Sequence, residues 1–429
     1  MLSSPMDAAI LAIGTELTRG ELCDTNSCWL SERLTELGVD VIEHATVDDD
    51  TARIAAAMMR LGQQVDWVVT TGGLGPTSDD LTTAAATAAL GVPLERDPGS
   101  VAALEARYRR LGRVMPPGNL VQADFPAGAR VLANDAGTAP GFSFRLGRAN
   151  FYCVPGVPRE MRHIVERHLV PDVTARVRRT THQVHFRCHG LAESEVAERV
   201  ADFDAGGALA RPGITLGYRA TMGEIELKVL ARAENEPEAR RLANDVAGQV
   251  RERLGWHVFG GRGDTLAKVV GEELRAVGLT LALAESCTGG LVGKLLTDNP
   301  GSSDYLLLSA VTYANGAKTR LLGVEGDLLE RHGAVSSEVA AAMAEGALRV
   351  SGADLSVALT GIAGPGGGSE EKPVGTVWFG LARPGFRPHT ERRQLPADRE
   401  LVRRFAALHA LGMIRATLAG RLTLDPSEP

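Results

Sequence analysis

The sequence is poor in aromatic side chains, which make up 4% of its 429 residues. Proteins that bind single-stranded nucleic acid by stacking need aromatic platforms, so this composition disfavours that mode of binding. Positive charge is not in excess either, because 46 Lys and Arg stand against 53 Asp and Glu and give a net charge of −7. A surface built throughout to neutralise nucleic acid or anionic lipid is therefore excluded.

Cysteine is scarce, and long apolar runs are missing. The five cysteines are an odd number scattered over the chain, which argues against a disulfide scaffold and for a reducing compartment. No stretch reaches the roughly 20 apolar residues of a membrane-spanning helix. The apolar run 8–13 is too short for the core of a signal peptide. We therefore expect a cytoplasmic protein with no membrane partner.

Glycine, in contrast, is abundant, with 49 residues. Without a collagen-like period, this abundance is typical of many tight turns and of ligand loops lined by backbone. Hydrophobic residues make up 44% and charged residues 23% of the chain, the balance of a globular protein with a buried core. The length predicts two or three domains.

Apolar runs alternate with amphipathic stretches in residues 1–165 and again from Thr265 onward. This alternation predicts βαβ units and parallel sheets. The residues between these two parts have the pattern of an α+β segment with few loops suited to catalysis. We therefore predict an α/β protein, with two separate α/β domains joined by a small α+β domain. The predicted domain boundaries are 1–168, 169–261 and 262–425.

Two glycine-rich turns follow predicted strands in the first domain. Ligands bind beyond the carboxyl ends of parallel strands, so both turns should line one crevice. Small residues let backbone N–H groups and the following helix N-terminus face an anion. The alternative interpretation is a tight turn capped by Asp. The residues that we expect to bind a ligand here are Gly14, Glu16, Gly72, Gly73, Gly75 and Thr77.

Acidic residues stand near both turns. Asp79 and Asp80 follow the second turn and can hold a divalent cation that bridges to the bound anion. Asp49 and Asp50 are expected to be solvated caps rather than ligands.

Six segments of this domain occur together in one order, 14–17, 24–26, 47–49, 70–82, 134–141 and 155–161. Together they resemble the molybdopterin-binding superfamily, in the version found at the start of CinA proteins (competence/damage-inducible protein A). The resemblance covers residues 7–165. It implies metal-dependent hydrolysis of ADP-ribose to AMP and ribose 5-phosphate, with Asp48 and Asp80 near a cation of the Mg, Mn or Co type.

The last domain contains a serine in a comparable turn. Ser286 follows a predicted strand, 280–284, and lies in a glycine-rich turn that precedes a predicted helix. This arrangement exposes a hydroxyl beside free backbone N–H groups, as an acyl-transfer nucleophile with an oxyanion hole requires. The turn residues expected to contact substrate are Thr288, Gly289 and Gly290. Cys287 is the rival nucleophile, because a thiol is intrinsically more reactive, but adjacent side chains in such a turn point in different directions.

No histidine of this domain has a motif around it, so a different base is needed. Lys318, with Tyr313 nearby, follows a predicted strand. A lysine desolvated in a pocket can lose its proton near neutral pH and act as a base, and Ser/Lys pairs are a known variant of the catalytic triad. The alternative is that Lys318 is an ordinary surface residue.

A glycine-dense loop and a final helix complete the predicted site. The loop 361–368 can wrap a phosphate, and Thr360 can donate its hydroxyl proton to it. Arg399 can hold the same phosphate with a bidentate fork. The loop residues expected to contact substrate are Thr360, Gly361 and Gly364.

Together these motifs resemble the CinA C-terminal domain, the pyridine nucleotide deamidase family, over residues 265–422. The resemblance implies hydrolysis of nicotinamide mononucleotide to nicotinate mononucleotide and ammonia, without a cofactor. It assigns Ser286 as the nucleophile and Tyr313 with Lys318 as its activating partners. Ala314 stands where the family pattern usually keeps Ser, which leaves the Tyr and Lys positions unchanged. A homodimer is also expected from the resemblance alone.

The middle segment resembles the small KH-like domain of long CinA proteins. It lacks a Gly-x-x-Gly clamp with basic flanks, so we expect no direct nucleic-acid binding and interpret it as a spacer or dimer contact. Two alternatives to the bifunctional salvage enzyme stay open. One is a non-catalytic binding protein linked to competence, with a recombination protein as partner. The other is a deamidase whose N-terminal domain only binds nucleotide.

Overall fold

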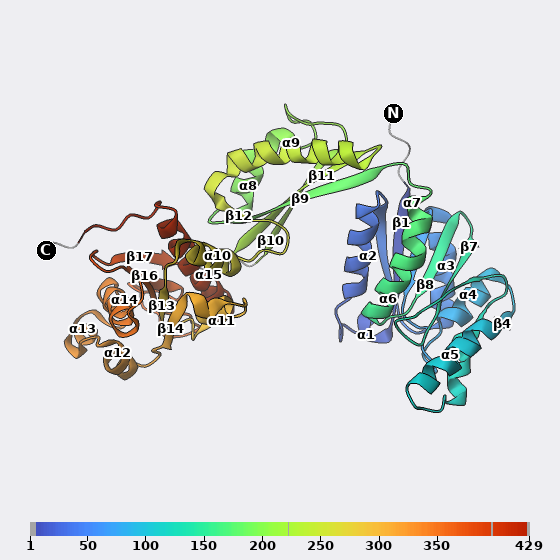
Figure 1. Ribbon diagram of the computed structural model, residues 1–429, viewed down its shortest axis with the longest axis horizontal. Helices are drawn as coiled ribbons and strands as arrows, with labels where there is room; N and C mark the ends of the chain where they lie inside the picture. Colours follow the sequence, from blue (N-terminus) through green and yellow to red (C-terminus); the bar gives the residue numbers. More distant parts are fainter. Residues whose placement is uncertain (1–5, 222, 396–397, 427–429) are drawn as a thin grey trace. The chain divides into compact units, whose positions relative to one another are not determined.

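The computed structural model describes residues 6–221, 223–395 and 398–426 (Figure 1); the first five residues of the predicted domain 1–168 lie outside this range. The chain divides into two compact units, one of residues 1–183 and 230–243 and the other of residues 184–229 and 244–429. The division passes through the middle region, so that β9, β11 and α9 each contribute to both units. Among the described residues, no helix is long and apolar enough to cross a membrane.

A mixed sheet forms the centre of the first unit, with the strand order β2-β1-β3-β8-β7-β6. The pairs among β2, β1, β3 and β8 are parallel, as predicted. β8, β7 and β6 pair in the antiparallel sense. β7 and β8 are joined by only two residues, too few for the crossover that a parallel pair needs. The strands are β1 (Asp7–Ile13), β2 (Asp40–Val47), β3 (Trp67–Thr71), β6 (Arg130–Leu132), β7 (Gly141–Leu146) and β8 (Ala149–Val154).

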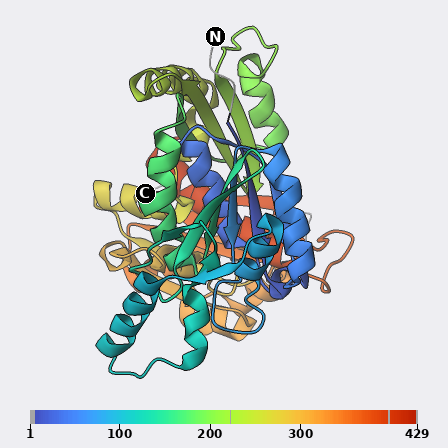
Figure 2. The same cartoon turned by 90° about the vertical axis from the view of Figure 1, so that its right-hand side faces the viewer.

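Helices cover both faces of this sheet (Figures 1 and 2). Alternate residues of β1 pack into two cores, Leu11 with Ile54 and Met58 of α3, and Ile10 with Leu30 of α2. Because both faces are buried, β1 is a continuous apolar run rather than an alternating one. The helices are α1 (Thr15–Thr18), α2 (Thr25–Glu36), α3 (Thr51–Gln64), α4 (Thr82–Leu90), α5 (Pro98–Arg110), α6 (Pro158–Ile164) and α7 (Val170–Thr174), and a short two-stranded sheet joins β4 (Leu94–Arg96) to β5 (Asp124–Pro126).

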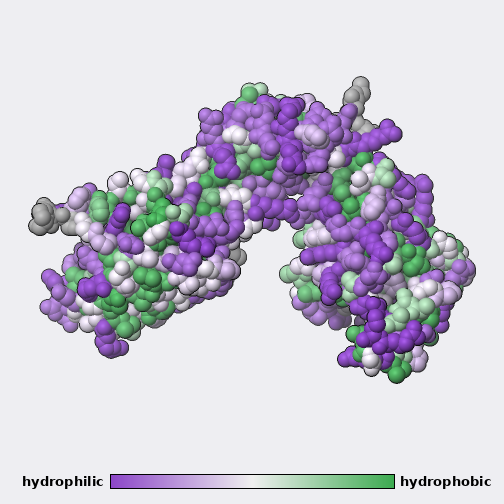
Figure 3. Space-filling view, viewed as in Figure 1, coloured by the Kyte–Doolittle hydropathy of each residue, from purple (hydrophilic) through white to green (hydrophobic). Residues whose placement is uncertain are grey.

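The middle region has a sheet with the strand order β10-β11-β9-β12. Phe186 and Leu227 from this sheet pack against Val196 of α8 and Val246 of α9. The exposed side of α9 is rich in charged residues, and the surface over this helix is largely hydrophilic (Figure 3). The elements are β9 (Thr180–His189), β10 (Ile214–Thr221), β11 (Glu224–Ala233), β12 (Val258–Gly260), α8 (Glu193–Val200) and α9 (Glu236–Leu254).

The rest of the second unit is built on a sheet with the strand order β14-β13-β15-β16-β17. β13 pairs in parallel with β14 and β15, whereas β16 and β17 are antiparallel. β13 is buried on both faces: Leu283 packs against Val270 and Leu411 on one side, and Ala284 against Met343 on the other. The strands are β13 (Leu281–Glu285), β14 (Leu306–Val311), β15 (Leu355–Gly361), β16 (Thr376–Ala382) and β17 (His389–Gln394). The helices are α10 (Leu266–Val277), α11 (Leu291–Thr297), α12 (Asn315–Leu322), α13 (Gly326–His332), α14 (Ser337–Ser351) and α15 (Arg399–Leu418).

Candidate active site

Ser286 directly follows β13, an interior strand of the sheet, where a tight turn leads into α11. Its backbone N–H donates to Leu359 O of β15 at 3.0 Å, and Gly289 N donates to Ser286 O at 3.0 Å. The turn needs glycine at Gly289 and Gly290, whose φ angles of 61° and 90° are left-handed. Ser286 is 8% exposed, so its hydroxyl is largely withdrawn from bulk solvent.

Glu285, which the sequence reasoning did not select, anchors this turn. Its side chain is fully buried. Its carboxylate accepts hydrogen bonds from Val292 N at 3.1 Å and Gly293 N at 2.8 Å, the first turn of α11. A carboxylate is favoured at a helix N-terminus, where backbone N–H groups lack intrahelical partners. The available signal was an acidic residue at the end of a buried strand, directly before the predicted nucleophile.

Lys318 is buried against the serine. It belongs to α12 and is 1% exposed, so it is not a surface residue. Its Nζ lies 3.1 Å from Ser286 Oγ, 2.9 Å from Thr312 O and 3.3 Å from Tyr313 O. Desolvation lowers the pKa of Lys318 from its ordinary value, because burial disfavours the charged form. The contact and the lowered pKa are what a lysine needs to take a proton from the serine.

Tyr313 and Arg399 lie at the mouth of the same site. The Tyr313 side chain is exposed, and its phenolic oxygen accepts a hydrogen bond from Arg399 Nη2 at 3.1 Å. Arg399 Nη1 donates to Gly364 O at 2.7 Å. The Tyr313 phenol therefore bonds to Arg399 and not to Lys318. The contact between Tyr313 and Lys318 is a hydrogen bond from the lysine Nζ to the tyrosine backbone carbonyl.

A cavity of about 290 Å³ opens over these residues. The predicted residues that line it are Ser286, Tyr313, Lys318, Thr360, Gly361, Gly364 and Arg399, together with Gly366 and Gly367 of the predicted glycine-dense loop and with Asn315. The predicted turn residues Thr288, Gly289 and Gly290 are not part of the lining. The Thr360 hydroxyl donates to Ala334 O at 2.6 Å, so its proton is already engaged within the protein.

Cys287 also lines the cavity, but its environment suits a thiol rather than a thiolate. Burial raises its pKa to about 12, and the reactive form of a cysteine is the thiolate. In the described part of the chain, Lys318 Nζ bonds to Ser286 Oγ and not to the sulfur. The geometry therefore favours Ser286 as the nucleophile.

The first unit contains a larger pocket of about 750 Å³, lined by both glycine-rich turns. Of the predicted residues, Gly14, Glu16, Gly72, Gly73, Gly75, Asp79 and Asp80 line it, whereas Thr77 and Asp48 do not. Thr77 instead supports Asp80, donating from its backbone N–H to Asp80 Oδ2 at 2.8 Å and from its hydroxyl to the same oxygen. At Gly75 a Cβ atom would come within 2.4 Å of that oxygen, so the close approach requires glycine.

The surroundings of Asp48 and Asp49 are the reverse of those predicted, since Asp48 was expected near the cation and Asp49 as a solvated cap. Asp48 forms an ion pair with Arg53 at 2.6 Å. Asp49 lines the pocket, and its Oδ2 accepts a hydrogen bond from Thr15 N at 2.8 Å, so it is not a solvated cap. Asp50 is the cap of α3, accepting from Arg53 N. Side chains alternate along an extended segment, which is how neighbouring carboxylates come to face different surroundings.

Whether this pocket suits a divalent cation depends on the carboxylates that line it. Among the described residues, no group of three or more His, Cys, Asp or Glu is placed to hold a metal ion. Mg²⁺ commonly takes one or two protein carboxylates and completes its shell with water and substrate phosphates. Asp49 and Asp80 both line this pocket, so it offers the one or two carboxylates that such a cation uses.

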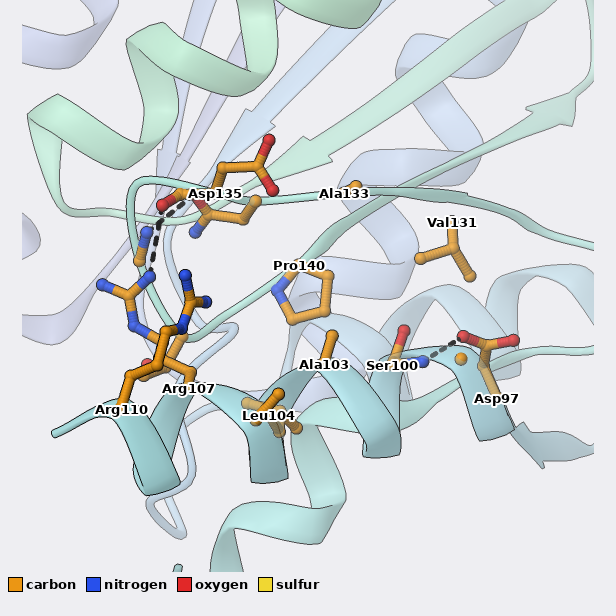
Figure 4. A pocket seen from close by; sticks show the side chains of 15 residues that line it. Asp97, Ser100, Ala103, Leu104, Arg107, Arg110, Val131, Ala133, Asp135 and Pro140 are labelled. Atoms are coloured by element: carbon orange, nitrogen blue, oxygen red, sulfur yellow. Dashed lines mark hydrogen bonds between the residues drawn. The ribbon is translucent and has the colours of Figure 1, made fainter. Parts of the chain in front are cut away.

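A separate pocket of about 390 Å³ lies between α5 and residues 131–140 of the same unit (Figure 4). Arg107 donates to the backbone carbonyls of Asp135 and Ala136. Asp97 caps the start of α5 through Ser100 N. None of the residues predicted to bind ligand lines this pocket, but Thr138 lines both it and the larger pocket, so the two adjoin.

Comparisons with protein families match three consecutive parts of the chain. Residues 9–175 match a probable molybdopterin binding domain, residues 184–260 the damage-inducible protein CinA KH domain, and residues 263–418 the CinA C-terminal domain.

Individual proteins match over nearly the whole length. A putative competence-damage inducible protein of Symbiobacterium thermophilum is 44% identical over 431 residues, covering 97% of this chain and 100% of its own. A CinA-like protein of Geobacter metallireducens is 44% identical over 416 residues, covering 96% and 99%. Among solved structures, the competence/damage inducible protein CihA of Agrobacterium tumefaciens is 41% identical, covering 36% of this chain and 93% of its own, with a TM-score of 0.35. The resemblance seen in the sequence motifs is confirmed, and the chain belongs to the CinA family.

Proposed function

We propose that the C-terminal site hydrolyses the carboxamide of nicotinamide mononucleotide, giving nicotinate mononucleotide and ammonia. The observation that carries the proposal is the contact between Lys318 Nζ and Ser286 Oγ at 3.1 Å, with the lysine 1% exposed. A nucleophile and its base within hydrogen-bonding distance at the end of a strand is the arrangement used for acyl transfer. Membership of the CinA family supports this class of reaction.

The reaction proceeds through an acyl-enzyme. Neutral Lys318 takes the proton of Ser286 as Oγ attacks the carboxamide carbon. Cys287 lines the cavity, and among the described residues its N–H donates to no backbone carbonyl, so this N–H is the candidate to bind the oxyanion. The protonated lysine then gives its proton to the departing amine, and ammonia leaves. Water activated by the same lysine cleaves the ester and frees Ser286.

The remainder of the substrate is a ribose phosphate. Arg399 and the loop with Gly364, Gly366 and Gly367 line the cavity. The guanidinium of Arg399 has five N–H donors, and the two hydrogen bonds it makes to Gly364 O and Tyr313 Oη fix its orientation. A guanidinium held in this way can bind a phosphate. The proposal is tested by incubating the purified chain with nicotinamide mononucleotide and measuring ammonia.

In a pH profile of ammonia release, kcat/KM should rise with pH on the acidic side. Lys318 acts as a base only when neutral, and desolvation lowers its pKa below the ordinary 10.5. As pH rises through this lowered pKa, the neutral fraction grows and kcat/KM increases, reaching a plateau above it. The check is a pH profile of kcat/KM for ammonia release. A rate that falls over the same pH range would contradict a lysine base.

We further propose that the N-terminal pocket hydrolyses ADP-ribose to AMP and ribose 5-phosphate. Its support is the pocket of about 750 Å³ with carboxylates beside a glycine-rich turn. Asp80 and Asp49 would hold a divalent cation of the Mg, Mn or Co type. When bound, such a cation neutralises diphosphate charge and favours attack by water. The turn's glycines let the backbone approach the diphosphate closely, and Thr77 fixes the Asp80 carboxylate.

Replacing Asp80 separates the two activities. In Asp80→Asn, AMP release from ADP-ribose with Mg²⁺ should fall by on the order of 10²-fold or more, because a charged oxygen that balances the cation is lost. Ammonia release from nicotinamide mononucleotide should be unchanged, since Ser286 and Lys318 lie in the other unit. The measurement is chromatography of nucleotide products from both substrates. Asp48→Asn serves as the matched control, because that carboxylate pairs with Arg53 and faces away from the pocket lining.

A further inference from the structure

The first two turns of α15 contact three separate segments around the C-terminal cavity. Arg399 bonds to Gly364 O and to the Tyr313 phenol. Arg403, four residues later and thus on the same side of the helix, donates from Nε and Nη2 to Thr288 O at 3.2 and 2.8 Å. Arg399 lines the cavity, whereas Arg403 does not. Arg403 therefore acts on the turn that follows Ser286 and not on the contents of the cavity.

The peptide between Thr288 and Gly289 is held at both of its edges. Its carbonyl oxygen accepts both hydrogen bonds from Arg403. Its N–H, on the opposite edge of a planar trans unit, donates to Ser286 O at 3.0 Å. At Gly289 an added Cβ would lie 3.4 Å from Arg403 Nη2, so the guanidinium packs closely on the turn. One peptide unit thus connects the guanidinium to the backbone of the nucleophile.

We propose that Arg403 is a positioning residue for Ser286, which sets the orientation of the nucleophile's turn through the Thr288 carbonyl. The inference rests on the proposed amide hydrolysis at this site. Hydrogen bonds from a charged donor are stronger than neutral ones, and they polarise the next bond in a chain. With Arg403 removed, Glu285 still binds the start of α11, so the fold persists. The peptide after Thr288 then keeps only its N–H bond to Ser286 O, and we expect the turn to loosen, so that Ser286 Oγ loses its alignment.

The test is Arg403→Ala, assayed for ammonia release from nicotinamide mononucleotide. We expect kcat to fall by about 10²-fold, the scale of a small misplacement of reacting groups, with KM nearly unchanged. Added guanidinium chloride should restore part of the activity by occupying the vacated space. Circular dichroism and thermal unfolding check that the variant is folded. The matched control is Arg331→Ala, because Arg331 is exposed and, in the described part of the chain, it bonds within its own helix α13, to Asp327 O.

A second readout is independent of the substrate. Diisopropyl fluorophosphate labels an activated serine: the Ser286 Oγ–P bond forms, the P–F bond breaks, fluoride leaves, and Lys318 takes the proton. Labelling followed by protein mass should slow in Arg403→Ala by a factor similar to the fall in kcat, and guanidinium should recover it. Three results would overturn the inference. The variant could be labelled at the wild-type rate with wild-type kcat, its defect could be confined to KM, or guanidinium could fail to restore its lost activity.

The same readout separates the two proposals. A wild-type chain that is labelled but releases no ammonia would reject nicotinamide mononucleotide as the substrate, and the labelling rates would still decide the role of Arg403. A wild-type chain that is not labelled at Ser286 would overturn the positioning role together with the nucleophile.

Discussion

Ser286→Ala should abolish ammonia release from nicotinamide mononucleotide, lowering kcat by a factor on the order of 10⁴ or more. The hydroxyl is the only group removed, and it is the one that Lys318 Nζ contacts at 3.1 Å. Without Oγ no acyl-enzyme forms, while the cavity and its phosphate-binding end are unchanged. The fold should tolerate the substitution, because the turn is held by backbone bonds to Leu359 and by Glu285. Ammonia assays under saturating substrate measure the effect.

Cys287→Ala is the informative comparison for this prediction. The sulfur is buried, and the pKa of its thiol is raised to about 12, so little thiolate exists at neutral pH. We expect this variant to keep most of its activity and to lose some stability from the small void it leaves in the core. Activity that survives in Ser286→Ala and disappears in Cys287→Ala would reverse the assignment of the nucleophile.

Lys318→Met should be the second severe loss, with kcat reduced by about 10²- to 10⁴-fold, the usual contribution of a general base. Methionine occupies the buried space of the aliphatic part of the lysine side chain but has no amine. Ser286 Oγ, Thr312 O and Tyr313 O then lack their donor. An unsatisfied buried acceptor costs about 1–3 kcal/mol, so the free energy of unfolding should fall while the chain still folds. Ammonia assays and urea titration measure the two effects.

Two further substitutions sharpen that result. Lys318→Arg keeps a positive charge and hydrogen-bond donors, but a guanidinium cannot be deprotonated in a protein. It should therefore be as inactive as Lys318→Met if the lysine is a base. Lys294→Met, on the exposed surface where the lysine pairs with Asp298, should leave the rate unchanged. A fully active Lys318→Arg variant would mean that only the charge is needed.

The positions of the candidate catalytic groups could largely be predicted from sequence, because each follows a predicted strand, either the buried β13 or the half-exposed edge strand β14. The runs ending at Glu285 and at Val311 are the ends of β13 and β14, which pair in parallel. Ser286 and the segment carrying Lys318 must therefore emerge at the same edge of the sheet. The burial of Lys318 could not be predicted, because it depends on how α12 packs and not on any local pattern.

Other features depended on tertiary contacts that the sequence does not display. Asp49 instead of Asp48 lines the N-terminal pocket, because the orientation of successive side chains at the end of β2 decides which carboxylate faces inward. The Tyr313 phenol bonds to Arg399, which is 86 residues away in sequence. The antiparallel pairing of β7 with β8 follows from their two-residue connection, which alternation of strands and helices does not reveal.

The most direct test of the central claim is to identify the acylated residue during turnover. The purified chain is mixed with nicotinamide mononucleotide, quenched with acid while ammonia is being released, and digested for peptide mass spectrometry. We expect an acyl group derived from nicotinate mononucleotide, joined as an ester to Ser286. A thioester on Cys287, or release of ammonia with neither residue acylated, would contradict the central claim.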